Sequence, residues 1–132
     1  MKICVYTCIT GGYDRLTEPK VVPEGVDFIC FSDKVIPSKI WMHRDIPSEL
    51  QFLSDVKKQR VIKICPHRYL SEYDISVWVD GNIAIIGDIT KFIAQYDLDA
   101  VPFYSRVHLS RNCIYDEAEA CIAMKKDSEL NI

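Results

Sequence analysis

The chain has 132 residues, of which 48% are hydrophobic and 27% are charged, and its formal net charge is −3. This length suits one compact domain, residues 1–132, and is too short for two of ordinary size, while the composition excludes a largely disordered chain. The mildly acidic balance provides no general electrostatic attraction to nucleic acid or to an anionic membrane, so we expect neither as a partner.

The N-terminal residues 1–9 contain one lysine and a short apolar run. The run is too short for the core of a signal peptide, so we predict a first strand here, no transmembrane segment and a cytoplasmic chain. The cysteines form no C-x-x-C pair and mostly lie in apolar runs, which disfavours zinc and favours reduced, buried thiols. They are Cys4, Cys8, Cys30, Cys65, Cys113 and Cys121.

Short runs rich in β-branched and aromatic residues alternate with segments of helical period, which is typical of an α/β fold with a mostly parallel sheet. Two of these runs are apolar on both faces, as expected for strands covered on either side. After the first run, residues 9–25 lack periodicity and contain several glycines and prolines, so we predict a loop. The predicted strands are residues 2–8, 27–33, 39–44, 75–80 and 99–105.

A helix is predicted over residues 54–65. It should end before Pro66, because the residue that precedes a proline is pushed out of the helical region. Arg60 and Lys63 are three residues apart, so they share one face near the end of this helix.

Two further helices follow, over residues 88–96 and from about Ile114. Asp88 can cap the first of them, and its apolar residues recur at i, i+3, i+4 and i+7, which predicts a core-facing helix. The positions expected to face the core are Ile89, Phe92, Ile93 and Tyr96 in one helix and Ala118, Cys121 and Ile122 in the other.

Polar residues follow three of the predicted strands. In an open parallel sheet, ligands bind beyond the carboxyl ends of the strands, near the point where strand order reverses. We therefore expect these residues to meet in one crevice, although they come from distant segments. They are Thr7, Gly11, Gly12 and Tyr13 after the first strand, Asp33 after the second, and Asp80 to Asn82 after the strand at 75–80.

Asp80 and Asn82 have the spacing of an aspartate followed by an oxygen ligand at i+2. Such a pair can hold Mg²⁺ or Mn²⁺ with positions left for diphosphate oxygens, and the metal would neutralise a departing nucleotide diphosphate. Arg60 and Lys63 could bind the same phosphates.

Each of these patterns also has a simpler interpretation. An Asp-Gly pair after a strand is usually a turn, and cationic residues on a helix often form only a solvated face. The segment "GGYD" lacks the glycine spacing of a dinucleotide site and of a P-loop. His67 and His108 are more often structural than catalytic when considered singly, and no covalent catalytic triad can be defined from the sequence.

Four segments together resemble a glycosyltransferase-like family, long catalogued as a domain of unknown function, that includes plant pectin- and mucilage-related proteins and bacterial polysaccharide-synthesis proteins. The match extends over nearly the entire chain, and "PHRYL", "WVDGNI" and "RNCIYDEAEA" in this order are its most specific part. The segments are "VYTCITGGYDRL", "VDFICFSD", "KICPHRYLSEYDISVWVDGNIAI" and "HLSRNCIYDEAEAC".

The resemblance implies a Rossmann-like, GT-A-type fold and an enzyme that transfers a sugar from a nucleotide diphosphate donor to a glycan acceptor in polysaccharide synthesis. The donor that it favours is a UDP-sugar. It implies Mn²⁺ or Mg²⁺ at Asp80, with Asn82 where many such enzymes carry a second aspartate. The residues that it implies for the nucleotide sugar are Thr7, Gly11, Tyr13, Asp33, Arg60, Lys63 and His67.

A last segment of the family pattern, H-x-x-R-x-C-x-Y-x-E-A, contains His108, Arg111 and Glu117. The resemblance implies that these residues line the sugar or acceptor side and, together with Asp80, serve catalysis. It does not assign their individual roles.

Domains of this family resemble GT-A enzymes in continuing for roughly another hundred residues, a size expected of an acceptor-binding half. We therefore expect this chain to be the donor-binding portion, with an open sheet edge that a second copy or a partner chain covers. The alternative is a non-catalytic module that binds a nucleotide sugar or a protein. A nucleotidyltransferase would share the layout, but its Gly-rich basic signature near the first strand is absent.

Overall fold

The computed structural model describes residues 1–105 and 113–125. The chain divides into two compact units, residues 1–95 and residues 96–132, and each is described by itself. The expectation of one domain over residues 1–132 stays a prediction.

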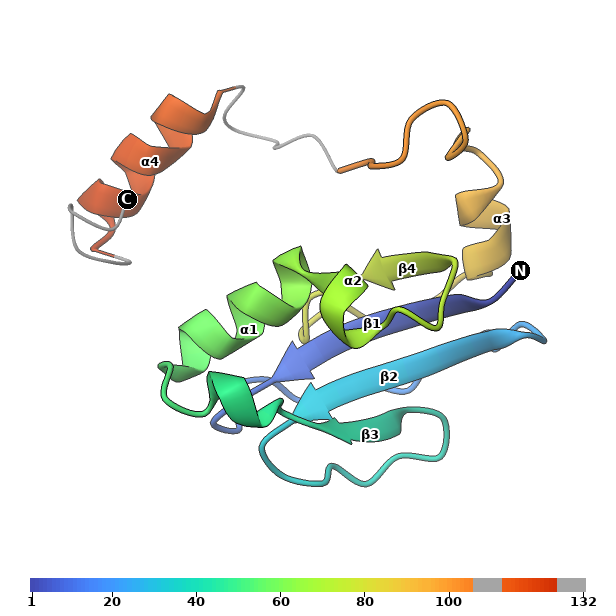
Figure 1. The fold of residues 1–132 in the computed structure, drawn as a ribbon, viewed down its shortest axis with the longest axis horizontal. Coiled ribbons are helices and arrows are strands. Elements are labelled where there is room, and N and C mark those ends of the chain that lie inside the picture. The colour runs from blue at the N-terminus through green and yellow to red at the C-terminus, as the bar shows by residue number, and fades with distance from the viewer. Residues whose placement is uncertain (106–112, 126–132) are drawn as a thin grey trace. The chain divides into compact units, whose positions relative to one another are not determined.

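The first unit is built on a parallel sheet of four strands in the order β3-β2-β1-β4 (Figure 1). Tyr6 lies opposite both Ile29 and Trp78 in the register, so β1 is paired on both sides. This arrangement confirms the predicted α/β class with a parallel sheet. The strands are β1 (Ile3–Ile9), β2 (Val26–Ser32), β3 (Met42–Asp45) and β4 (Ile75–Trp78).

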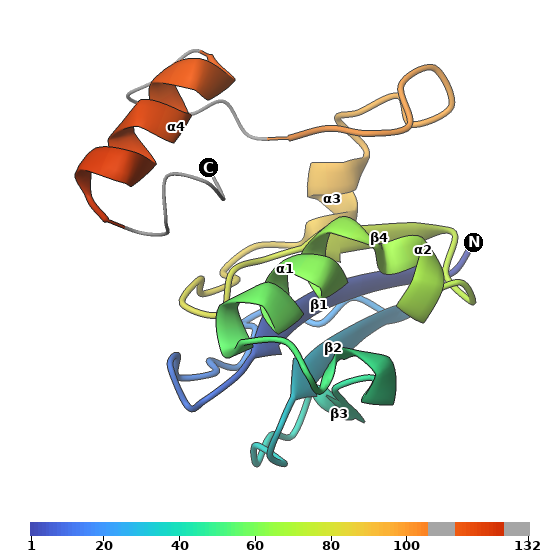
Figure 2. The same ribbon diagram turned by 60° about the vertical axis from the view of Figure 1, so that its left-hand side comes forward.

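One face of this sheet is covered by helices, as the two ribbon views agree (Figures 1 and 2). They are the 3-10 helix η1 (Ser48–Leu50), α1 (Asp55–Ile64) and α2 (Pro66–Tyr69). The Ser54 hydroxyl caps α1 by accepting a hydrogen bond from the Lys57 backbone N–H. The helix ends before Pro66 as predicted, and Pro66 then opens α2, because a proline needs no hydrogen-bond partner at the first helical position.

The core has two layers, one on each face of the sheet. Even-numbered residues of β1 pack under α1 and α2, whereas odd-numbered ones pack against loops and the short helix α3 (Ile89–Ile93). This division follows from the alternation of side chains along a strand and confirms that β1 is covered on both faces. The first layer includes Cys4, Tyr6, Cys8, Ile29, Phe31 and Ile62, and the second includes Val5, Ile9, Phe28, Cys30, Trp41 and Ile89.

Two predicted strands differ from the structure. Residues 99–105 form no strand, because Val101 N–H donates to the Asp97 carbonyl at 2.9 Å and closes a turn, so that prediction is wrong. The predicted strand 39–44 begins only at Met42, since the Ser38 hydroxyl accepts hydrogen bonds from the backbone N–H groups of Ile40 and Trp41 and turns the chain there.

The predicted helix 88–96 is also shorter than expected. Asp88 caps α3 through a 2.9 Å hydrogen bond from Thr90 N–H, as predicted. The helix stops at Ile93, because the following residues tighten into a turn in which Gln95 N–H donates to the Phe92 carbonyl. Ile89 and Ile93 pack into the core as expected, whereas Phe92 and Tyr96 are 47% and 37% exposed, so the prediction is wrong for these two.

The second unit contains α4 (Ile114–Ala123), which confirms the predicted third helix. The Cys113 sulfur caps it by accepting from Asp116 N–H at 3.4 Å. Ala118 and Cys121 are half-buried as expected, but Ile122 is exposed.

All six cysteines are free thiols, and three of them are buried in the sheet. Burial raises the pKa of Cys4 and Cys8 to about 12 and that of Cys30 to about 11. Over residues 1–105 and 113–125, no helix is both long and apolar enough to cross a bilayer.

Candidate functional site

The carboxyl ends of β1, β2 and β4 meet at one edge of the sheet, which we call the carboxyl edge. At this edge Gly11 N–H donates a hydrogen bond to Asp33 Oδ2 at 3.1 Å. The bond joins the loop after β1 to the end of β2, two segments that are distant in the sequence. The register that pairs Ile9 with Ser32 brings these residues together, since both strands end at the same level. The predicted meeting of the β1 loop with Asp33 is therefore present.

The Gly11-Gly12 turn has a backbone that only glycine adopts easily. Both residues have positive φ, +63° and +64°, and Tyr13 N–H closes the turn on the Thr10 carbonyl at 3.3 Å. A Cβ on Gly11 would lie 2.8 Å from Asp55 Oδ2, so the N-terminus of α1 comes close to this turn. Tyr13, at the end of this turn, is 90% exposed and can contact a ligand.

The segment after β4 turns sharply at Asp80. Val79 N–H still donates to the Tyr6 carbonyl at 3.0 Å, and Ile83 N–H then closes a turn on the Asp80 carbonyl at 2.9 Å. The simpler interpretation of Asp-Gly as a turn is thus correct, although it does not exclude a binding role. Asn82 lies in the same turn with an exposed side chain.

Gly81 is buried at the centre of this turn, where the β1 loop crosses it. A Cβ there would lie 2.8 Å from Asp14 Oδ2 and 3.0 Å from Ile9 Cγ1. Asp14, the last residue of "GGYD", therefore packs against the turn that carries Asp80. Sequence reasoning missed Asp14, because only the crossing of two loops distant in sequence brings it there.

Among the described residues, the Asp80 carboxylate has two partners, and both come from the helical face of the sheet. Trp78 Nε1 donates to Asp80 Oδ1 at 2.8 Å, and the Lys63 ammonium lies 3.6 Å from the same oxygen. The Lys63 and Asp80 side chains are 48% and 57% exposed. Asp80 follows an apolar strand but is not buried, so its charge is partly hydrated, and such an exposed ion pair contributes at most about 1 kcal/mol.

Trp78 is a second residue that sequence reasoning missed, although the i, i+2 spacing places it on the same face of the strand as Asp80. Its ring centroid lies 5.4 Å from Lys63 Nζ, a distance suited to a cation–π contact. The ring also packs edge-on against Tyr6, with centroids 5.2 Å apart. Trp78 thus contacts both members of the ion pair.

The backbone of Lys63 is tied to the sheet. The Tyr6 hydroxyl donates to the Lys63 carbonyl at 2.8 Å, and Tyr6 itself is 2% exposed. Burial, which disfavours the phenolate, raises the pKa of Tyr6, so the hydroxyl stays a donor. Arg60 lies one turn earlier on α1 with an exposed side chain, and no hydrogen bond or ion pair engages it within the described part of the chain.

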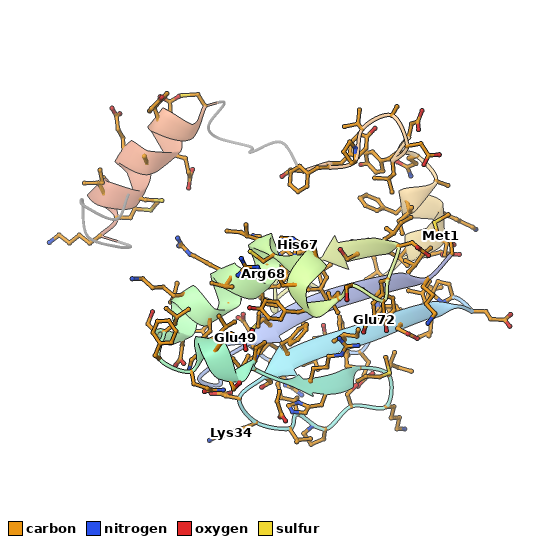
Figure 3. The ribbon with its side chains drawn as sticks, in the orientation of Figure 1. Met1, Lys34, Glu49, His67, Arg68 and Glu72 are labelled. Carbon is orange, nitrogen blue, oxygen red and sulfur yellow. The ribbon has the colours of Figure 1, made fainter. Side chains whose placement is uncertain are left out.

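Thr7 and His67 are not brought into this group of residues. Thr7 is 1% exposed on the opposite face of the sheet, and its Oγ1 has no hydrogen-bond partner among the described residues. His67 lies on α2 beside Arg68 (Figure 3) and lines a separate groove of about 350 Å³ with Asp74 and Ser76. A nucleotide held at Asp33 and Asp80 would therefore not reach Thr7 without displacing core residues.

The remaining predicted residues belong to the second unit. Glu117 lies on α4, where its Oε1 accepts a hydrogen bond from Cys121 Sγ at 3.5 Å. His108 and Arg111 lie outside the described residues.

A groove of about 530 Å³ opens beside Asp33, at the carboxyl ends of β2 and β3. Its lining combines carboxylate, hydroxyl and amide groups with a small apolar surface, which suits a polar ring or a ribose. Sequence reasoning missed it because β3 and η1, which form its far side, had no motif. The lining residues are Ser32, Asp33, Asp45, Ile46, Pro47, Ser48 and Gln51.

The described residues contain no group of three His, Cys, Asp or Glu side chains that could hold a metal. Asp80 nevertheless fits a hard divalent cation, because its Oδ2 has no partner among the described residues and Asn82 offers an amide oxygen in the same exposed turn. Mg²⁺ in particular is often bound by only one or two protein groups, with water and phosphate oxygens supplying the rest.

Comparison with known proteins identifies the family of the chain. No curated protein and no solved structure shows a significant match. The family described as TOD1/MUCI70, glycosyltransferase-like domain, matches residues 1–132. This match extends over the sheet, the carboxyl edge and α4, and it agrees with the parallel α/β architecture. The chain therefore belongs to the TOD1/MUCI70 glycosyltransferase-like domain family.

Proposed function

We propose that this chain binds a nucleotide diphosphate sugar and transfers the sugar to a glycan acceptor in polysaccharide synthesis. The favoured donor is a UDP-sugar. Membership of a glycosyltransferase-like family supports the general reaction. The single observation that carries the donor site is the exposed carboxylate of Asp80, which attracts the Lys63 ammonium at 3.6 Å at the carboxyl edge of a parallel sheet. Ligands of open α/β sheets bind at this edge.

The nucleoside is proposed to occupy the groove beside Asp33. Asp33 already accepts a hydrogen bond from Gly11 N–H, and a carboxylate has room for further donors, such as a base N–H or a ribose hydroxyl. Tyr13, exposed on the adjoining turn, offers an aromatic ring to the base. The groove and the Gly11 turn together thus provide hydrogen-bonding and stacking groups for a nucleoside.

The diphosphate is proposed to lie between Asp33 and Asp80, with Lys63 and Arg60 of α1 as its cationic partners. Both cations can pair with phosphate oxygens, and Arg60 is exposed for this purpose. Asp80 and Asn82 are proposed to hold Mn²⁺ or Mg²⁺ through oxygen ligands. When bound, the metal supplies positive charge that stabilises the departing nucleotide diphosphate.

The test is calorimetric titration of the protein with UDP, GDP and their sugar conjugates, with Mn²⁺ and again with EDTA. We expect UDP to bind only with the metal. Asp80→Asn keeps an acceptor for Trp78 but removes the charge, and it should weaken metal-dependent binding by at least about tenfold, as loss of a charged ligand does.

Asp74→Asn is the matched control, because Asp74 is also an exposed aspartate, but its partner is the Lys2 backbone N–H. It should bind UDP as the unmodified chain does. Equal UDP affinity in the Asp80→Asn chain and the unmodified chain would overturn the donor site. Binding without release of sugar, in an assay of donor turnover, would favour the non-catalytic module instead.

A further inference from the structure

Lys63 and Asp80 form a loose contact. Their 3.6 Å separation is longer than the 2.7–2.9 Å or so of a charge-assisted hydrogen bond, so the two groups attract each other without a close bond. Both side chains are about half exposed, and water can replace either partner. The ammonium can therefore leave the carboxylate at little cost.

The surroundings favour movement of the lysine head over movement of its backbone. The Tyr6 hydroxyl holds the Lys63 carbonyl at 2.8 Å, whereas a lysine side chain has a flexible four-carbon stem. Trp78 Nε1 holds Asp80 Oδ1 at 2.8 Å, so the carboxylate stays in place when the ammonium departs. The Trp78 ring, 5.4 Å from Nζ, keeps the cation nearby.

We propose that Lys63 competes with the divalent metal for Asp80 and couples metal binding to diphosphate binding, an inference that rests on the proposed donor site. In the chain without ligands, the ammonium neutralises Asp80 and opposes the metal. When a nucleotide diphosphate binds with the metal, the ammonium transfers to the phosphate oxygens and leaves Asp80 to the metal.

The coupling follows from charge balance. A divalent cation beside Asp80 repels the Lys63 ammonium unless an anion gives the ammonium another partner, so metal alone should bind weakly. A diphosphate supplies that partner, and the metal then binds more tightly. By reciprocity, the metal raises diphosphate affinity by the same factor.

The experiment is a titration with Mn²⁺ alone, in which binding is measured by calorimetry or from the electron paramagnetic resonance signal of free Mn²⁺. We expect Lys63→Met to bind Mn²⁺ at least about fivefold more tightly than the unmodified chain, within the usual range of coupling between sites. The gain should vanish in the double variant Lys63→Met/Asp80→Asn. Equal or weaker Mn²⁺ binding by Lys63→Met overturns the competition.

Lys57→Met is the matched control, because Lys57 is an exposed lysine on the same helix and its side chain has no hydrogen bond or ion pair in the described part of the chain. It removes the same charge but should leave Mn²⁺ affinity within about twofold, since surface charges at a distance are screened. A gain equal to that of Lys63→Met would attribute the effect to net charge and overturn the specific role of Lys63.

A second titration repeats these measurements with UDP present. In the unmodified chain UDP should tighten Mn²⁺ binding. Lys63→Met should reduce this factor by at least about fivefold, and the part that comes from direct coordination of the metal by the phosphate oxygens should remain. If UDP binds neither chain but Lys63→Met still gains Mn²⁺ affinity through Asp80, the donor proposal and the coupling fail and the competition stands. If UDP binds with the metal but Lys63→Met changes neither titration, the donor site stands and this inference fails.

Discussion

The interior of the sheet and its carboxyl edge differ in side-chain chemistry, since the interior is mostly apolar and buried and the edge is charged and exposed. In β1, residues 4–9 are at most 2% exposed, and their side chains are apolar groups, thiols, one phenol and one hydroxyl. At the carboxyl edge, Asp33, Lys63 and Asp80 are all exposed, and the one ion pair among them is 3.6 Å long. The interior therefore determines stability, whereas the edge holds charges that can exchange partners.

The division teaches where substitutions should act. A change in the interior alters packing that has no alternative arrangement, so it should appear in the free energy of unfolding. A change at the edge removes a half-hydrated contact, so it should appear in ligand binding and scarcely in stability.

The largest expected effect is on the alkaline stability of the interior. Burial raises the pKa of Cys4, Cys8 and Cys30 from 9.0 to about 12, 12 and 11, so these thiols stay protonated in the folded chain where they ionise in the unfolded one. The unfolded state then binds fewer protons, and stability falls as the pH rises above about 9. Each such thiol costs about 1.4 kcal/mol per pH unit until its folded pKa is reached.

Denaturant unfolding at pH 8, 9, 10 and 11 measures this slope. Cys30→Ala should make the slope shallower, because one buried thiol is removed. Cys113→Ser is the control, because Cys113 is exposed and lies outside the buried sheet. A slope in Cys30→Ala equal to that of the unmodified chain would contradict the assignment.

An intermediate effect is expected where the edge meets the interior, at Gly81. A Cβ there would lie 3.0 Å from Ile9 Cγ1, and Ile9 is 2% exposed, so Gly81→Ala should lower the free energy of unfolding by about 1–3 kcal/mol, as overpacking does. Thermal and denaturant unfolding measure the change. Gly87→Ala is the control, because no described residue lies within 4 Å of its Cβ position, and a similar loss in both variants would contradict the steric explanation.

The smallest expected effects are on the free energy of unfolding at Thr7 and Thr10, where the two substitutions should act in opposite directions. The Thr7 hydroxyl is buried without a partner among the described residues, so Thr7→Val should raise the free energy of unfolding by about 1 kcal/mol. The Thr10 hydroxyl donates to the Asp55 carbonyl at 3.1 Å, so Thr10→Val should lower it by about 1 kcal/mol. Equal signs in denaturant unfolding would show that the Thr7 hydroxyl has a partner.

Sequence patterns were most informative where the structure is local. The beginning of α1 just after Ser54, its end before Pro66 and the cap at Asp88 all match expectation, because each depends on hydrogen bonds within a few residues. The prediction of a strand over residues 99–105 was wrong because local hydrogen bonds form a turn there. A turn anchored by Asp97 competes locally with strand formation, and its signal was outweighed by the apolar run.

The sequence by itself determined the parallel α/β class and identified the residues that follow the strands, since alternation and periodicity are properties of neighbouring residues. It could not determine which of them meet. The contacts between Asp80, Trp78 and Lys63, the packing of Asp14 against Gly81, and the burial of Thr7 were decided by the tertiary structure. The physical reason is that these contacts depend on strand register and on how α1 and the loops cross the sheet, and packing over long sequence separations sets both.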